Sequence, residues 1–222
     1  MTEETMNRRV SISFDNGPTE GVTERVLDVL AARQIQASFF PVAQRIDSPW
    51  ARDILARARS EGHRVGNHSL THRAPMGDLS EEETVYEIAG AQSILGELAS
   101  PGRLIRPWGT EGVLCQKCLN RPALEYLQRE KYTCVLWNSV PRDWERPVEW
   151  VRYALADVEL MEETLVVLHD LPTGAMDVLD TFISELRARN VDITAEYPHS
   201  CVPIQEGSLR FGHDVWSTLV CD

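Results

Sequence analysis

Apolar positions along the chain follow two spacings, one typical of strands and one typical of helices. Residues 9–14 alternate apolar and polar side chains, as a strand does, whereas residues 23–33 repeat apolar side chains at helical spacing. The other predicted strands are 37–42, 63–67, 104–105, 132–137, 164–168 and 191–194, with a last short one over 215–220. The other predicted helices are 50–61, 80–98, 121–130, 148–160 and 178–189, and Ser80 with Glu83 has the spacing of a capping box.

This order of elements predicts an α/β fold. Strands that alternate with helices of ten or more residues usually pair in parallel. About seven such units fill the chain, which is too many for a small open sheet and close to a barrel. The length of 222 residues, without a long linker, predicts one domain over residues 1–222. In such folds the functional side chains lie at the carboxyl ends of the strands.

The composition is acidic. The chain has 22 Lys and Arg against 34 Asp and Glu, a net charge of −12. Phosphate backbones and anionic lipids repel such a chain, so we expect neither a nucleic-acid nor a membrane partner. No apolar run approaches the ~18 residues of a membrane span, and no signal peptide is visible, which favours a cytoplasmic protein.

The cysteines do not indicate a disulfide scaffold, because their number is odd and their density is low, with five in 222 residues. Cys115 and Cys118 form a CxxC pair. With Cys134 the pair could bind zinc or act in redox chemistry. No second pair at a zinc-finger spacing accompanies it, so we interpret the two as ordinary thiols in a loop.

Polar residues follow the first and third predicted strands. Asp15 and Asn16 precede Gly17 and Pro18, a sequence typical of a tight turn. His68 and His72 are four residues apart, so both rings could reach one metal ion if the segment were helical. Taken alone, the first motif is more often only a turn, and the second is as often a pair of surface histidines.

Residues that could serve a functional site also follow three later predicted strands. Arg106 lies in a proline-bounded turn and could pair with a carboxylate. Trp137, Asp143 and Trp144 lie in one loop that suits a ligand groove. His169 ends an apolar strand, as either a core histidine or a general acid or base. Each motif alone is more often structural, but five of them at five strand ends indicate a site.

These five segments, in this order, resemble the motifs of the NodB homology domain, the polysaccharide deacetylases of carbohydrate esterase family four. The likeness covers roughly residues 9–195. The family motif T-F-D-D-G-P corresponds to residues 13–18, with Asn16 in place of the second Asp, and H-[S/T]-x-x-H is matched fully by residues 68–72. The other three motifs match less closely. R-x-P-Y corresponds to residues 106–109, which have one residue fewer between the arginine and the aromatic residue, and D-x-x-D-W corresponds to residues 140–144, in which the first Asp is replaced. L-x-H corresponds to residues 167–169.

The resemblance implies a distorted (β/α)7 barrel, related to the TIM barrel, and hydrolysis of an N-acetyl group or another small amide. It implies that Asp15 is the general base, that His169 is the general acid, and that a divalent metal, with zinc favoured, assists. It also implies that the metal ligands are Asn16, His68 and His72, that Arg106 orients Asp15, and that Asp143 holds His169. The implied substrate-binding residues are Trp108, Trp144 and Val167, and a backbone N–H near Trp108 would help to form the oxyanion hole.

These roles agree with the chemistry of amide hydrolysis. The reaction needs an activated water, and a divalent ion makes water more acidic. A carboxylate can take the proton that water loses, and the departing amine needs a proton from an acid. A histidine beside an aspartate suits that second role, because the aspartate raises the pKa of the histidine.

Asn16 departs from the family motif and leaves three functional interpretations. An amide oxygen is neutral, so the ion would keep its full charge among three neutral ligands and bind more weakly. The first interpretation is a metal-assisted deacetylase of an N-acetylated sugar or oligosaccharide. The second is a metal-independent or weakly metal-dependent hydrolase of a non-sugar amide or cyclic imide, and the third an inactive carbohydrate-binding relative. An open groove lined by Trp108 and Trp144 would favour a sugar, and a closed pocket a small amide.

Overall fold

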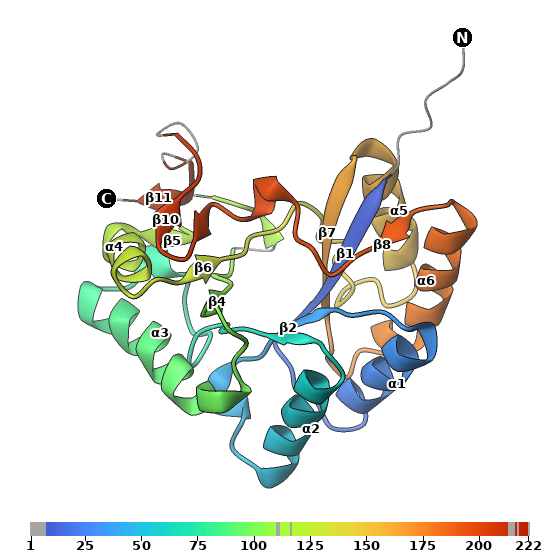
Figure 1. Cartoon of the computed structure of the whole chain (residues 1–222), viewed down its shortest axis with the longest axis horizontal. Helices are drawn as coiled ribbons and strands as arrows, with labels where there is room; N and C mark the ends of the chain where they lie inside the picture. The colour runs from blue at the N-terminus through green and yellow to red at the C-terminus, as the bar shows by residue number, and fades with distance from the viewer. Residues whose placement is uncertain (1–7, 110–111, 116, 213–215, 217, 222) are drawn as a thin grey trace.

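The centre of the fold is a curled sheet around β1 (Arg9–Asp15), shown in blue in Figure 1. The computed structural model describes residues 8–109, 112–115, 117–212, 216 and 218–221. β1 pairs in parallel over its whole length with β7 (Glu163–His169). On its other side it pairs with β8 (Asp192–Ile193) at its start and with β2 (Ser38–Phe40) at its end.

Single bridges close this sheet into a barrel. The remaining parallel strands are β3 (Arg64–Val65), β4 (Leu104–Ile105) and β6 (Thr133–Cys134). One bridge joins Asn67 to Ile105, and another joins Ser139 to Val166. The ring therefore runs β1, β2, β3, β4, β6, β7 and back to β1, with β8 beside the start of β1. The predicted α/β barrel with about seven parallel strands is confirmed within the described residues.

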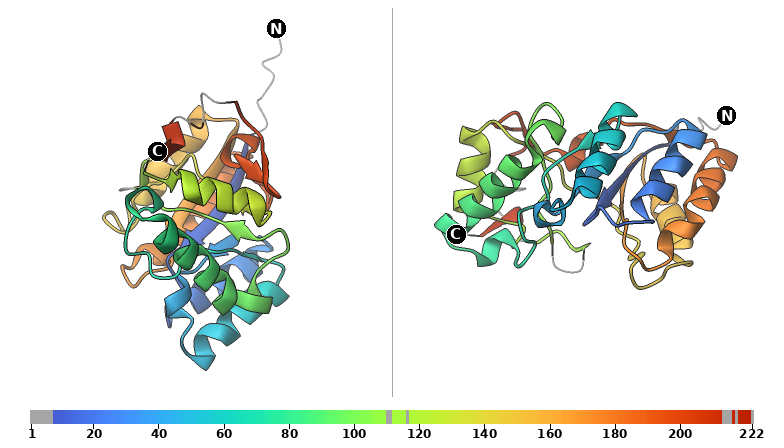
Figure 2. Two further views of the ribbon diagram at one scale, coloured as in Figure 1. Left: turned by 90° about the vertical axis from the view of Figure 1, so that its left-hand side faces the viewer. Right: turned by 90° about the horizontal axis from the view of Figure 1, so that it is seen from below.

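Helices cover the outside of the barrel (Figure 1). They are α1 (Thr23–Arg33), α2 (Pro49–Ser60), α3 (Glu81–Leu95), α4 (Arg121–Arg129), α5 (Trp150–Leu160) and α6 (Leu179–Ala188). In the right-hand view of Figure 2, the green helices α3 and α4 lie at one end of the molecule, and the blue α1 and orange α6 lie at the other. Within the described residues, no helix is long and apolar enough to cross a membrane.

Short elements complete the fold. The 3-10 turns are η1 (Ala43–Arg45), η2 (Met76–Asp78), η3 (Gly96–Leu98), η5 (Ala175–Val178) and η6 (His199–Cys201). The remaining strands are β5 (Leu119–Asn120), β9 (Ile204–Gln205), β10 (Ser208–Leu209) and β11 (Val220–Cys221). β9 pairs antiparallel with β6 and β10, so the added C-terminal strands extend the sheet on the β6 side.

α3 begins with the cap that the sequence predicts. Ser80 accepts a hydrogen bond from the backbone N–H of Glu83 at 3.3 Å, and the Glu83 carboxylate accepts one from the backbone N–H of Ser80 at 2.9 Å. This is the predicted capping box. α2 begins in a similar way, because Ser48 accepts from the backbone N–H of Ala51.

β1 is buried on both faces, although its alternating pattern is typical of a half-exposed strand. Val10, Ile12 and Phe14 pack under the helices. Ser11 and Ser13 are also buried, and Ser13 donates a hydrogen bond to the backbone carbonyl of Val166. The polar positions therefore face the interior of the barrel rather than solvent.

The strand predicted over 215–220 is wrong in extent. Residues 216, 218 and 219 are helical, and the strand is β11 (Val220–Cys221), which pairs in parallel with β5. Residues 215 and 217 lie outside the described residues. A short apolar run fits a helix or a strand equally well, and here it forms a helical turn before the strand.

Candidate active site

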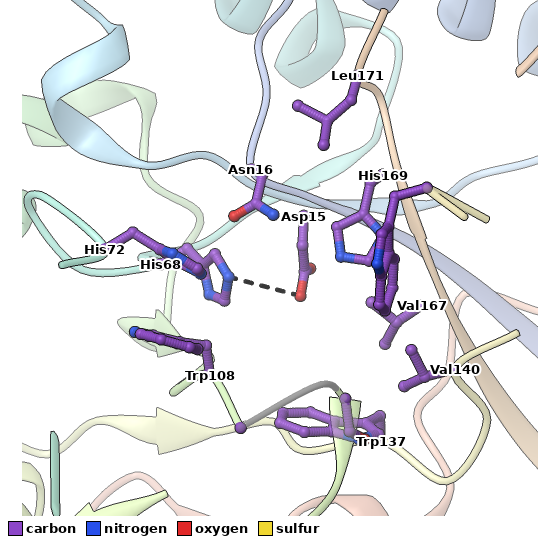
Figure 3. A pocket seen from close by; sticks show the side chains of 13 residues that line it. Asp15, Asn16, His68, His72, Trp108, Trp137, Val140, Val167, His169 and Leu171 are labelled. Carbon is purple, nitrogen blue, oxygen red and sulfur yellow. Dashed lines mark hydrogen bonds and ion pairs between the residues drawn. The ribbon is translucent and has the colours of Figure 1, made fainter. Parts of the chain in front are cut away.

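A cavity of about 330 Å³ lies at the carboxyl ends of the barrel strands. Figure 3 shows the side chains that surround it. They are Asp15, Asn16, His68, His72, Trp108, Gly109, Gly112, Trp137, Val140, Trp144, Val167, His169 and Leu171. Segments that follow β1, β3, β4, β6 and β7 therefore meet here, as the strand-end motifs predict.

Asp15 is the last residue of β1 and is almost completely buried. Arg106, which is fully buried, donates a hydrogen bond to the Asp15 carboxylate at 2.8 Å and another to the Ser13 hydroxyl at 2.7 Å. Its guanidinium also lies 4.2 Å from the ring centre of Phe40. The buried carboxylate is thus paired with a buried cation in a fixed orientation.

His68 is buried beside this pair. Its Nδ1–H donates to the backbone carbonyl of Arg106 at 2.8 Å, because a carbonyl oxygen can only accept. Nε2 therefore carries the lone pair in the neutral ring, and it lies 3.7 Å from an Asp15 carboxylate oxygen (dashed line in Figure 3). Burial lowers the pKa of His68, so the ring is neutral at pH 7.

His72 lies next to His68, with 4.9 Å between the ring centres. The segment is not helical, which was the condition stated for one helix face to carry both rings: residues 68–72 form a loop in which Ser69 and His72 have left-handed φ values of 65° and 56°. The left-handed turn, rather than a helix face, brings the two rings together. Burial and the neighbouring His68 lower the pKa of His72 to about 3.

Asn16 projects into the cavity beside the two histidines, with its amide oxygen on their side (Figure 3). That oxygen is buried and has no hydrogen-bond partner in the described part of the chain. The backbone of Asn16 is fixed in a left-handed conformation, with φ of 75°, by its N–H to the Phe40 carbonyl and by Arg45, which donates to the Asn16 carbonyl. A buried acceptor without a partner fits a metal ligand.

Three donor atoms for a cation are thus available: the Asn16 amide oxygen and one nitrogen each from His68 and His72. Over the described ranges, no group of three or more His, Cys, Asp and Glu side chains is arranged to hold a metal ion. The third candidate donor at this cavity is an amide, a group that this search does not include. Cys115, Cys118 and Cys134 are free thiols and do not form such a group.

His169 lies opposite Asp15 in the β1–β7 register. Asp143, fully buried, accepts hydrogen bonds from His169 Nδ1–H at 2.8 Å and from the His169 backbone N–H at 2.9 Å. Burial lowers the pKa of His169, but the hydrogen bond and the charge of Asp143 outweigh this effect and raise the pKa overall. The histidine beside Asp143 therefore favours its protonated form, unlike His68 and His72.

The cavity walls are mainly apolar. Trp108, Trp144 and Val167, the predicted substrate-binding residues, all line it. Trp144 packs edge-on against His169, with ring centres 4.8 Å apart. The walls also include Trp137, which the sequence analysis places in a loop suited to a ligand groove, together with Val140 from the same loop and Leu171 after β7, which it did not single out. All three lie within six residues of Asp143 or His169 along the chain, which is the feature of the sequence that could have identified Val140 and Leu171.

Asp170 is a second residue that the sequence analysis did not single out. It is buried, accepts a hydrogen bond from the Thr23 hydroxyl, and lies against Gly17 of the loop that carries Asp15 and Asn16. Burial raises its pKa to about 7. This carboxyl therefore packs against the loop after β1.

Comparisons with known proteins find deacetylases of similar sequence. The family model described as polysaccharide deacetylase matches residues 2–110. A chitooligosaccharide deacetylase of Azorhizobium caulinodans is 29% identical over 168 residues, which are 72% of this chain and 73% of the relative. The peptidoglycan-N-acetylglucosamine deacetylase PgdA of Listeria monocytogenes is 23% identical over 84% of this chain, and the match spans only 37% of that longer protein.

Solved structures of the same kind share the fold. A peptidoglycan N-acetylglucosamine deacetylase aligns with a TM-score of 0.73 and 23% identity, over 90% of this chain and 91% of that one. A family 4 acetyl xylan esterase from Clostridium thermocellum, in complex with a cobalt ion, aligns with a TM-score of 0.69 and 23% identity, over 85% and 88%. The chain therefore contains a polysaccharide deacetylase domain, similar to the hydrolases of carbohydrate esterase family four.

Proposed function

We propose that this protein removes an N-acetyl group from a sugar or oligosaccharide by metal-assisted hydrolysis at the cavity described above. The observation that carries the proposal is the placement around one cavity of a buried carboxylate, two histidines whose pKa values are lowered and a third histidine whose pKa is raised. The three indoles of the wall, those of Trp108, Trp137 and Trp144, offer the broad apolar faces on which sugar rings stack. The named activities of the relatives support the same substrate class.

In this mechanism Asp15 is the general base. It removes a proton from the water that attacks the amide carbonyl. Arg106 holds the carboxylate by donating to one Asp15 oxygen, and the Ser13 hydroxyl accepts a hydrogen bond from the same guanidinium and so fixes its position. The other Asp15 oxygen stays directed into the cavity beside His68.

His169 is the general acid. Its Nδ1–H is bonded to Asp143, so the Nε2–H is the proton available to the leaving nitrogen. The amine departs once it has taken this proton, and the acyl group leaves as a carboxylic acid. Because Asp15 and His169 lie side by side on β1 and β7, base and acid act from neighbouring strand ends.

Asn16, His68 and His72 would hold the divalent cation. Their nitrogen and oxygen donors suit zinc, and the lowered pKa values keep both rings in the neutral form that binds metals. When bound, such a cation polarises the amide carbonyl and makes the attacking water a stronger acid. The partnerless oxygen of Asn16 supports this ligand set.

The proposal is tested by incubating the protein, supplied with zinc or cobalt, with N-acetylglucosamine oligomers and measuring released acetate and free amine. We expect turnover by the wild type and a loss of order 10²-fold or more in Asp15→Asn and in His169→Ala. Asp28→Asn and His199→Ala are matched controls, because both residues are exposed and remote from the cavity. Absence of acetate with every oligomer, or equal turnover by Asp15→Asn, would contradict the proposal.

A second candidate function is hydrolysis of a non-sugar amide or a cyclic imide with little dependence on metal. The neutral Asn16 favours it, because a site without a carboxylate ligand holds a cation less tightly. Activity on a small cyclic imide that survives dialysis against a chelator would favour this candidate over the first. The cytoplasmic location expected from the sequence stays a prediction, which cell fractionation would test.

A further inference from the structure

The segment that follows β4 contacts both histidines of the proposed metal site. The backbone carbonyl of Arg106 accepts the Nδ1–H of His68 at 2.8 Å. Two residues later, the indole of Trp108 stacks on the ring of His72, with ring centres 4.4 Å apart and an angle of 16° between the planes. One short stretch of chain therefore fixes one histidine by a hydrogen bond and the other by stacking.

His72 has few other constraints on its ring. Its backbone is held by a hydrogen bond from its N–H to the Ser69 hydroxyl, and its ring also contacts the ring of His68. Metal-binding histidines usually donate their second ring nitrogen to a carboxylate, a carbonyl or a water. In the described residues no other side chain bonds to the His72 ring, which hydrogen-bonds only with its own backbone. Its plane is therefore set chiefly by packing.

Trp108 is itself held in place. Its Nε1–H donates to the carbonyl of Ala74 at 3.1 Å, in the loop that carries His72. The indole is thus tied to the loop that it supports, and its edge is unavailable as a donor to a substrate. This segment is also one residue shorter than the family motif, which has an extra residue between the arginine and the aromatic.

We propose that Trp108 is a positioning residue whose indole face fixes the ring plane of His72 for cation binding. The proposal rests on the proposed function, because it assumes that His72 is a ligand. Without the indole, the His72 ring would sample other rotamers. The entropy lost when the ring is held in one rotamer would then oppose metal binding. Loss of an outer partner of a metal-binding histidine typically weakens metal affinity 10–100-fold.

The test is a calorimetric titration of Zn²⁺ into the wild type and three variants. Trp108→Leu removes the aromatic face, whereas Trp108→Phe keeps a stacking face and loses only the bond to Ala74. Trp50→Leu is the matched control, because Trp50 is also half-buried and bonded through Nε1–H, to Glu24, but lies in α2. We expect affinity at least 10-fold weaker in Trp108→Leu, within about 3-fold of wild type in Trp108→Phe, and unchanged in Trp50→Leu.

The stacking is tested separately in the metal-free protein. The ring protons of His72 should be shifted upfield in NMR spectra by the indole ring current, and the shift should be lost in Trp108→Leu. Equal Zn²⁺ affinity in Trp108→Leu and wild type, or an unshifted His72 ring in the wild type, would overturn the positioning role alone. A wild type that binds no Zn²⁺ at millimolar concentration would overturn the proposed metal site and this role with it.

Discussion

Asn16 differs from the aspartate of the family motif by one charge and very little in size. Its amide oxygen is buried without a partner, and the neighbouring His68 and His72 are neutral. A cation at this position would meet three neutral donors. Among the described residues that line the cavity, the one carboxylate is that of Asp15, whose charge Arg106 balances. In the proposed metal site, the identity of residue 16 would therefore set how tightly the cation binds.

We predict that Asn16→Asp tightens Zn²⁺ binding by at least about 10-fold, because a charged oxygen replaces a dipole beside a divalent ion. Activity at limiting metal should rise in parallel. Calorimetric titration measures the affinity, with Asn190→Asp as the matched control on the exposed surface. Unchanged affinity in Asn16→Asp would remove residue 16 from the ligand set.

Asp170 gives a prediction for pH dependence. Burial raises its pKa to about 7 from the ordinary value of 3.8, so the folded state keeps a proton that the unfolded state loses. Its contribution to stability is fully present below pH 3.8 and is lost as pH rises through about 7. Asp170→Asn, which cannot ionise, should lose this dependence.

The free energy of unfolding, measured in urea at several pH values, provides the test. Between about pH 4 and pH 7, the difference between wild type and Asp170→Asn should change by up to ~1.4 kcal/mol per pH unit, the value for one proton. Taking the difference removes the contribution of the histidines, which titrate in both proteins. A difference that does not vary with pH would show that Asp170 is ionised in the folded protein.

At the scale of elements, strand pairing positions the catalytic groups. β1 and β7 pair along seven residues, and Asp15 and His169 are the last pair. The loop that follows β1 then turns against Asp170, the first residue after β7. The proposed base, the proposed ligand Asn16 and the proposed acid are therefore all set by one strand pair and the two turns beyond it.

This turn leaves no space for a side chain at Gly17. A Cβ atom there would lie 2.1 Å from an Asp170 carboxylate oxygen, and the φ of Gly17 is not positive, so the constraint is space and not backbone conformation. We predict that Gly17→Ala lowers the free energy of unfolding by about 1–3 kcal/mol, the usual effect of overpacking. Gly212→Ala is the control, because a Cβ there meets nothing within 4 Å. Equal urea midpoints for the two variants would contradict the close contact.

At the scale of the whole molecule, much of the fold could be predicted because local signals agree with the tertiary structure. The helix at 23–33 has the predicted limits, and α3 begins at its capping box. The strand ends identified the cavity, because parallel strands of a barrel bring their carboxyl ends together. The predicted catalytic residue Asp15 and its predicted partner Arg106 are in contact.

The remaining features depend on contacts through space that no local pattern reports. The left-handed turn at His72 replaces the predicted helical face. The stacking of Trp108 on His72 and the support of Gly17 by Asp170 join residues far apart in the chain. The short strand near the C-terminus was misplaced because a brief apolar run does not distinguish a helix from a strand.

The most direct test of the proposed site is anomalous X-ray scattering from crystals of the wild-type protein grown with zinc. Data collected at the zinc absorption edge locate the ion independently of any activity. The account predicts one strong peak within bonding distance, ~2.0–2.2 Å, of the Asn16 amide oxygen and of one ring nitrogen each of His68 and His72. A cavity without an anomalous peak, at a zinc concentration that saturates the protein in solution, or a peak bound to other residues, would contradict it.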